Sequence, residues 1–197
     1  MLLASLAYVT TLSGIVYFVQ IPTQKPVNYT VFGAQKETAY PLLAWPKTDH
    51  YGLPVRLKVP KLAVDAPVTY MGLTKSGAMD VPANIFDAGW YKHGTIPGNK
   101  GNAVLAGHVD GLKGQPGIFV DLHKLQKGDA LQIIDSNNVM ISFTVREARI
   151  YGQNDQPGEV FNASGAAHLN LITCTGAWDN ARHSFRERLV VFADKIN

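Results

Sequence analysis

The chain has a single cysteine, Cys174, at the end of the apolar run Leu171-Ile-Thr. A lone thiol is usually either a buried apolar residue or a reactive nucleophile. Two other reactive side chains flank similar runs: His108 ends one, and Arg188 opens another. All three therefore stand at the ends of expected strands, where a scaffold presents functional groups.

These residue types together suit acyl transfer. Only the thiolate form of a cysteine attacks an acyl carbon efficiently. A nearby histidine exchanges the proton and then protonates the leaving amine. The attack creates an oxyanion, which an always-charged arginine can stabilise. We interpret Cys174 as the nucleophile, His108 as the acid and base, and Arg188 as the oxyanion stabiliser. The alternative is a buried Cys174, a packed His108 and a solvated Arg188.

The strand pattern indicates how two of these groups meet. Side chains alternate between the two faces of a strand. In the expected strand His168–Cys174, Cys174 shares a face with Asn170 and Ile172. The strand that begins at Arg188 follows after the connection Thr175–Glu187. Antiparallel pairing of these strands would bring the thiol and the guanidinium group to the same rim.

After residue 50 the sequence consists of short β runs separated by Gly, Pro, Asn and Asp. One short helix is expected at Ile118–Leu125. About seven or eight short strands with little helix indicate an all-β fold, a closed or nearly closed barrel. The expected strands are Val55–Val59, Val64–Tyr70, Ala103–His108, Ala130–Asp135, Met140–Ile150, His168–Cys174 and Leu189–Ala193.

The first residues predict a membrane anchor. No charged side chain precedes Lys25, and about 20 apolar residues match a hydrocarbon core of about 30 Å. We expect a transmembrane helix over residues 1–21, a linker over 22–50 and a catalytic domain over 51–197. A cleaved signal peptide is the alternative, but the stretch is long and no A-x-A site follows it. Lys25 and Lys36 follow the span, so charge alone does not give its orientation.

Composition narrows the function classes. The 197-residue chain has a net charge of +3 with scattered basic residues, which argues against nucleic acid as a partner. One cysteine excludes an intramolecular disulfide and disfavours a cysteine-based zinc site. The histidines show no HExxH spacing. We expect no metal and no cofactor.

Several segments resemble one family. Leu171-Ile-Thr-Cys174-Thr-Gly, followed by Arg188-Leu-Val-Val-Phe-Ala193, resembles the signature of sortases. Ala103-Val-Leu-Ala-Gly-His108-Val-Asp-Gly is similar to the family's histidine segment. Upstream, Pro54–Pro67 and Gly77–Pro82 resemble the first strands of class E and F sortases. The resemblance spans residues 52–195.

The resemblance implies a closed eight-stranded sortase-type β-barrel with one or two short helices, behind a transmembrane helix. It implies a membrane-anchored enzyme with its catalytic domain outside the cell. Such an enzyme cleaves an LPxTG-like sorting signal between Thr and Gly. Cys174 would hold the thioacyl intermediate, with His108 and Arg188 in the roles given above. An amine of a peptidoglycan precursor would then accept the surface protein.

The resemblance also bears on residues around the site. Arg186 lies on the same strand face as Arg188 and is its one rival; otherwise it is a candidate substrate contact. Thr173 lines the groove or packs within its strand. The segment Tyr151–Ala167 corresponds to the loop that walls the sorting-signal groove in sortases. Within it, Val160 and Phe161 contact the peptide or anchor the loop.

Some sortases bind calcium near this loop. Here the loop offers only Asp155 and Glu159, too few carboxylates for a calcium site.

Two other functions stay open. A cysteine hydrolase of the papain-like type places the cysteine before the histidine, usually at a helix start. Here the order is histidine, cysteine, arginine, and the cysteine ends a strand. A membrane-anchored, non-catalytic β-barrel interaction module with an inert thiol is the second alternative. The rate at which a small electrophile labels Cys174 separates an enzyme from such a module.

Overall fold

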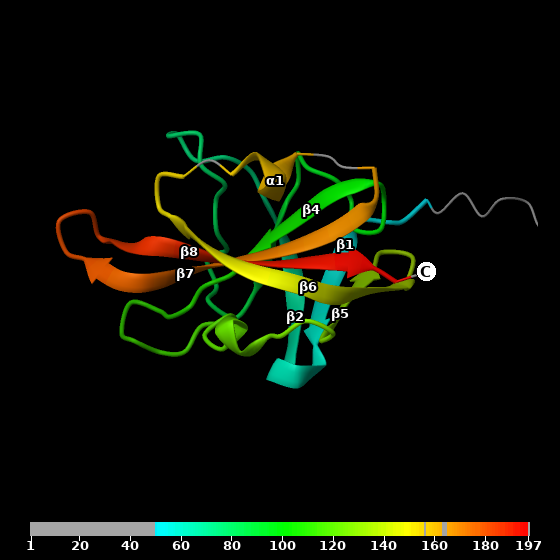
Figure 1. Ribbon diagram of the computed structural model, residues 1–197, viewed down its shortest axis with the longest axis horizontal. Coiled ribbons are helices and arrows are strands. Elements are labelled where there is room, and N and C mark those ends of the chain that lie inside the picture. Colours follow the sequence, from blue (N-terminus) through cyan, green and yellow to red (C-terminus); the bar gives the residue numbers. More distant parts are fainter. Residues whose placement is uncertain (1–49, 156, 163–164, 197) are drawn as a thin grey trace, which may run out of the picture. The chain divides into compact units, whose positions relative to one another are not determined.

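A closed barrel of eight strands makes up the part of the chain that the computed structural model describes, residues 50–155, 157–162 and 165–196. Around the barrel the strand order is β1-β2-β3-β4-β7-β8-β6-β5, and β5 pairs with β1 to close it (Figure 1). The strands are β1 (Pro54–Val59), β2 (Val64–Met71), β3 (Ala88–Tyr91), β4 (Gly101–Ala106), β5 (Ala130–Asp135), β6 (Met140–Gly152), β7 (Ala167–Asp179) and β8 (Ser184–Lys195). The predicted all-β, eight-stranded barrel is therefore confirmed.

Helical structure is sparse among the described residues. Two 3-10 turns, Pro60–Leu62 and Leu122–Lys124, connect strands, and one α-helical turn, α1 (Gly158–Phe161), lies between β6 and β7. The helix expected over Ile118–Leu125 is therefore only its last part, a 3-10 turn. The α1 turn was not anticipated from the sequence.

Strand direction decides which segments meet at the site. Neighbouring strands are antiparallel except for two parallel pairs, β2–β3 and β4–β7. A parallel pair aligns equivalent ends of its strands. The carboxyl end of β4, just before His108, therefore lies beside the middle of β7, just before Cys174.

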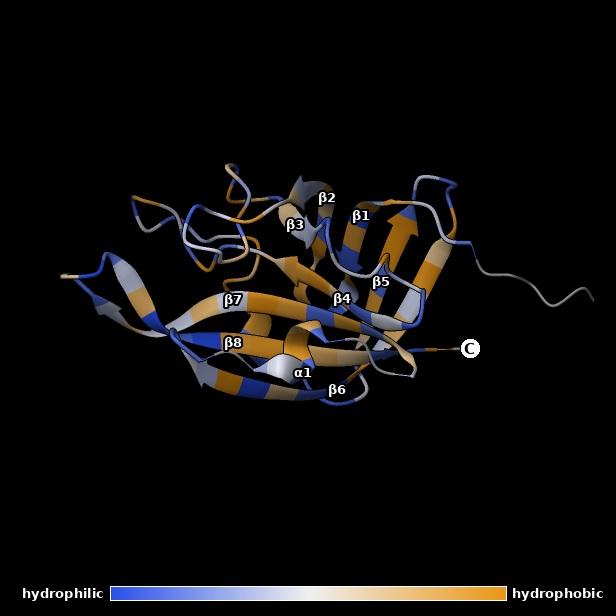
Figure 2. Cartoon of the chain, turned by 90° about the horizontal axis from the view of Figure 1, so that it is seen from above, coloured by the Kyte–Doolittle hydropathy of each residue, from blue (hydrophilic) through white to orange (hydrophobic). Residues whose placement is uncertain are grey.

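Residue alternation accounts for most of these strands. In β5 and in the first half of β6, every second side chain is buried, as expected when one face lines a core and the other meets solvent. In Figure 2 the strands carry long hydrophobic stretches, whereas their connections contain more hydrophilic segments. All six residues of β4 are buried, because β4 has the barrel interior on one face and α1 on the other.

Two apolar clusters follow from this arrangement. The barrel interior is filled by large aliphatic and aromatic side chains, which include Leu57, Leu105, Phe119, Phe143, Leu171 and Val191. A smaller cluster on the outside of the barrel joins Val160 of α1 to Val104, Val190 and Phe192. Burying Val160 therefore fastens α1 to β4 and β8.

Most predicted strands are found, with three differences. The strand expected over Ala103–His108 runs from Gly101 to Ala106, so His108 lies two residues beyond its end. The short strand β3 was missed. The segment Thr175–Glu187 was expected to be a loop, but β7 continues to Asp179 and β8 begins at Ser184. The two strands therefore form a long hairpin, visible as a paired extension at the left of Figure 1.

The predicted anchor (1–21) and nearly all of the predicted linker (22–50) lie outside the described residues. Within the described part, no helix has the length and apolar character needed to cross a membrane.

Candidate active site

The β7–β8 hairpin places Cys174 opposite Arg188. The two residues are direct partners in the antiparallel register, as the strand pattern predicted. Leu171 and Thr173 face the interior, and Ile172 and Cys174 face outward. The thiol and the guanidinium group therefore share the outer face of two adjacent strands.

The β4–β7 pair brings the histidine to the same place. In the parallel register Ala106 partners Ile172, and the Gly107 N–H donates to the Ile172 carbonyl at 3.0 Å. β4 ends at Ala106, and continuing its register by two residues would pair His108 with Cys174. Glycine is needed at 107 because a Cβ atom there would lie 2.5 Å from the ring of Phe119.

His108 is held by its ring and by its backbone. Its Nε2 lies 2.8 Å from the Pro82 carbonyl oxygen, and its own carbonyl accepts a bond from the Phe119 N–H at 2.9 Å. A carbonyl oxygen only accepts hydrogen bonds, so Nε2 carries a proton in this arrangement. The contact with Pro82 fixes both the ring orientation and the tautomer.

The environment of Cys174 favours the neutral thiol. Partial burial raises the pKa of this thiol above its ordinary value; the positive charge of Arg188 lowers it, and the negative charge of Asp110 raises it. Only a minority of the chains then hold a thiolate at neutral pH. The thiol thus depends on nearby groups for activation.

Arg188 is fixed by contacts at the start of its own strand. One terminal nitrogen, Nη1, donates to the carbonyl oxygens of Phe185 and Glu187, both at 2.8 Å. The other, Nη2, lies 3.2 Å from the Ser184 hydroxyl. A cation held in this way needs little reorganisation when negative charge develops beside it.

Arg186 occupies a different position. Its side chain is 64% exposed, and its Nε lies 3.5 Å from a carboxylate oxygen of Asp179. It stands opposite an irregularity of the β7–β8 register, between Thr175 and Trp178. The geometry therefore places Arg188, not Arg186, beside the thiol.

A groove of about 840 Å³ runs over the outer face of the barrel and includes Arg188. Its floor contains Ile172 and Val190, the neighbours of Cys174 and Arg188 on the same strand faces. One wall is formed by the β6–β7 connection with α1. Figure 1 shows α1 above the β4 and β7 strands. A mostly apolar groove that contains Arg188, the strand partner of Cys174, has the character of a peptide-binding site.

The candidate substrate residues divide into two groups. Val160 and Phe161 both line the groove; Val160 is buried beneath α1, whereas Phe161 is 44% exposed. Thr173 is only 4% exposed, and its hydroxyl donates to the Gly107 carbonyl at 2.9 Å. Of the two alternatives for Thr173, this contact favours packing within the strand, because its hydroxyl ties β7 to the segment before His108.

Some groove residues were missed from the sequence. Residues of the turn Leu73–Met79 also line the groove, and an isolated bridge joins the two ends of this turn. In the sequence its one glycine, Gly77, indicates only a break between strands. Ile172 and Val190 could have been found, because period-two alternation places them on the faces of Cys174 and Arg188.

No group of three or more His, Cys, Asp or Glu side chains within the described ranges could hold a metal ion. The two loop carboxylates have other partners: Asp155 accepts the Gly152 N–H at 2.7 Å, and Glu159 accepts the Tyr151 hydroxyl at 2.9 Å. The absence of a calcium requirement stays a prediction.

Comparisons with known proteins fit this geometry. Residues 57–196 match the family model of the sortase domain. No curated protein sequence matches the chain.

Three solved structures illustrate the likeness of fold. Sortase C from Clostridium perfringens SM101 is 18% identical, with a TM-score of 0.54 over 75% of this chain and 72% of that one. Sortase C1 from Streptococcus agalactiae is 21% identical, with a TM-score of 0.57 over 73% of this chain and 67% of that one. The Clostridium perfringens sortase D5 transpeptidase is 21% identical, with a TM-score of 0.55 over 73% and 79%. These are class C and D proteins, so the resemblance to classes E and F is not confirmed.

Proposed function

The chain belongs to the sortase family of cysteine transpeptidases, and we propose that it cleaves an LPxTG-like sorting signal between the threonine and the glycine. It then joins the new carboxyl end of a secreted surface protein to an amine of a peptidoglycan precursor. One observation carries this proposal. Cys174 and Arg188 are direct strand partners on the outer face that carries the groove, and β4, which ends at Ala106 beside Ile172, leads the chain toward them at His108.

In the first step the Cys174 thiolate attacks the threonine carbonyl carbon, and the electron pair of the C=O bond moves to the oxygen. The guanidinium group of Arg188 stabilises this oxyanion. When the intermediate collapses, the C–N bond to glycine breaks and His108 donates a proton to the leaving amine. The product is a thioester between Cys174 and the threonine.

In the second step the proton moves in the opposite direction, from the substrate amine to His108. An amine of the acceptor attacks the thioester carbonyl, His108 takes the proton from the amine, and the Cys174 thiolate leaves. Because Nε2 of His108 donates to the Pro82 carbonyl, we assign the exchanged proton to Nδ1. Water in place of the amine would give hydrolysis.

The groove supports a peptide substrate. Its apolar lining, including Phe161, Ile172 and Val190, suits the leucine and proline of such a signal, whereas the reacting carbonyl lies at the Cys174 end. We further propose that residues 1–21 anchor the chain in the cell membrane with the catalytic domain outside, where surface proteins and peptidoglycan precursors meet. The apolar composition of those residues supports the anchor, and the outer placement of the catalytic domain rests on the family alone.

The test is incubation of the protein with a panel of sorting-signal peptides, with and without an added amine. The expected result is cleavage between Thr and Gly, and a joined product only when the amine is present. Cys174→Ala should abolish both reactions while the circular dichroism spectrum stays unchanged. Release of the free acid alone, whatever the amine concentration, would identify a hydrolase instead; turnover by Cys174→Ala would refute the cysteine mechanism.

A further inference from the structure

The α1 turn forms part of the groove wall, although it is very short. Gly158, Val160 and Phe161 all line the groove. A single helical turn has little stability of its own. Its position must therefore come from contacts with the barrel beneath it.

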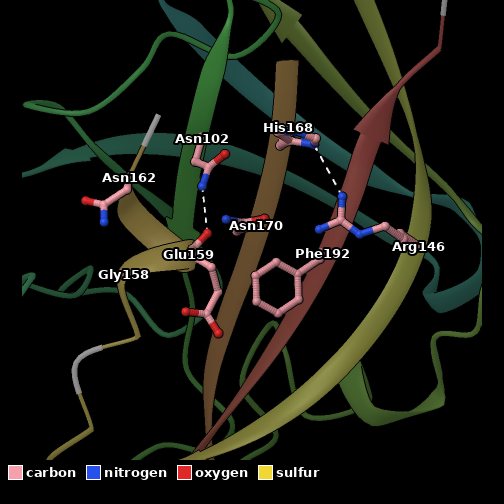
Figure 3. Close-up of a pocket in the computed structure, with 8 residues that line it drawn as sticks. All are labelled: Asn102, Arg146, Gly158, Glu159, Asn162, His168, Asn170 and Phe192. Atoms are coloured by element: carbon pink, nitrogen blue, oxygen red, sulfur yellow. Dashed lines mark hydrogen bonds between the residues drawn. The ribbon is translucent and has the colours of Figure 1, made fainter. Parts of the chain in front are cut away.

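Two asparagine side chains supply such contacts. The Asn102 Nδ2 group on β4 donates to the Glu159 carbonyl at 2.7 Å, and the Asn170 Nδ2 group on β7 donates to the Val160 carbonyl at 2.7 Å. Figure 3 shows Asn102 and Asn170 on adjacent strands, with the Asn102 bond drawn to Glu159. The two amides thus hold successive carbonyl groups of α1.

The burial of these asparagines indicates what they contribute. Asn170 is 0% exposed and Asn102 5%. Within the described ranges, Oδ1 of Asn170 is buried without a hydrogen-bond partner, which is unfavourable. Val104, its partner on β4, and Ile172, two positions along β7, are apolar. The unpaired Oδ1 atom of Asn170 therefore lowers the stability of the fold, and the hydrogen bond from its Nδ2 group to α1 offsets this loss.

The two hydrogen bonds to α1 are important because a cavity lies on each side of this turn. On one side lies the groove; on the other lies a second pocket of about 360 Å³, which includes Asn102, Asn170, Arg146 and His168 in its lining (Figure 3). Arg146 and His168 bind Asp194 on the far side of this pocket. Without the two amide bonds, α1 has room to shift toward either cavity.

We propose that Asn102 and Asn170 are positioning residues that fix α1 and so determine how tightly the groove binds the sorting signal. The inference rests on the proposed function. Neither side chain lies in the Cys174–Arg188–His108 cluster. Their removal is therefore expected to affect peptide binding and to leave the chemical step unchanged.

The test uses Asn102→Leu and Asn170→Leu, which replace the amide by an apolar group with the same number and branching of heavy atoms. KM for the best peptide should rise about three- to tenfold, the effect of losing one hydrogen bond, while kcat and the rate of Cys174 alkylation by iodoacetamide stay within about twofold. In hydrogen exchange, the N–H groups of Val160 and Asn162, which donate to the Pro157 and Gly158 carbonyl oxygens in α1 and its caps, should exchange faster.

Ile133→Val is the matched control, because it removes one methylene group from the barrel interior, away from α1. It should change neither KM nor α1 exchange. Unchanged KM and exchange in both Asn variants would overturn the proposal, as would an equal rise of KM in the control. If one Asn variant does not fold, the other decides. If the unaltered protein processes no peptide, the proposed function fails, and the exchange of α1 still decides whether the amides hold it.

Discussion

Cys174 lies between two opposite charges, Arg188 on β8 and Asp110 just beyond His108. Burial raises the pKa of the thiol most, Asp110 adds to the rise, and Arg188 opposes it. The thiol is protonated below its pKa, so any change that lowers this pKa increases the thiolate fraction at a fixed neutral pH.

Asp110→Asn should therefore accelerate the alkylation of Cys174 at pH 7, by about three- to tenfold for the loss of one partly exposed charge. The physical reason is a lower thiol pKa. The pH profile of iodoacetamide labelling, measured from pH 6 to 10, should shift toward lower pH. A profile that does not move, or that moves upward, would show that Asp110 does not act on the thiol.

Arg188→Ala should reduce kcat for peptide cleavage by about 10²–10³, the usual cost of losing a preorganised oxyanion partner. It should also shift the labelling profile of Cys174 toward higher pH. Arg186→Ala is the control, since that side chain is exposed and pairs with Asp179; its kcat should stay close to that of the unaltered protein. A larger loss in Arg186→Ala would show that Arg186, and not Arg188, has the catalytic role.

Among the elements, α1 presents Phe161 to the groove. The ring of Phe161 makes an edge contact with Tyr91, with centroids 5.9 Å apart. Phe161→Ala should raise KM for the sorting peptide about three- to tenfold through lost apolar contact, with an unchanged rate of thiol alkylation. Trp178→Ala on the β7–β8 hairpin removes a similarly exposed ring outside the groove and should leave KM unaffected. Similar effects in both variants would exclude a specific contact at Phe161.

The sequence predicted those elements whose local pattern is strong. β5 and β6 show clear alternation, and their expected bounds differ little from those observed. β3 was missed because Ala88-Gly-Trp-Tyr91 is short, contains a glycine and owes its form to pairing with β2. The α1 turn depends on Asn102 and Asn170, which lie far from it in sequence. Such tertiary contacts leave no local signal.

Among the site residues, too, those with a local sequence pattern could be predicted and those that depend on distant contacts could not. Side-chain alternation and the expected antiparallel pairing of the two strands were enough to predict that Cys174 and Arg188 lie side by side. The parallel partnership of β4 with β7, which brings in His108, leaves no trace in local alternation, because it joins strands that are far apart in the chain. The Pro82 carbonyl that holds the imidazole was missed because backbone acceptors carry no residue signature.

At the scale of the whole molecule, the barrel closes entirely within residues that follow the predicted anchor and linker. A chain that begins at His50 should therefore fold and process sorting peptides with the kcat and KM of the full chain. After cell fractionation, the full chain should be found with membranes and the shortened chain in the soluble fraction. Equal distribution of the two chains would contradict an anchor in residues 1–21, and loss of folding on shortening would show that the first 49 residues belong to the domain.

The parallel β4–β7 pair also has a consequence for the newly made protein. Its two strands are separated by all of β5 and β6, so their contact forms only after a large loop has closed. Until β4 and β7 pair, the His108 imidazole is far from the Cys174 sulfur. No single local segment can form the complete site by itself. A chain whose β4 and β7 strands have not yet paired is thus expected to be catalytically inactive, and the first turnover marks the completion of its folding.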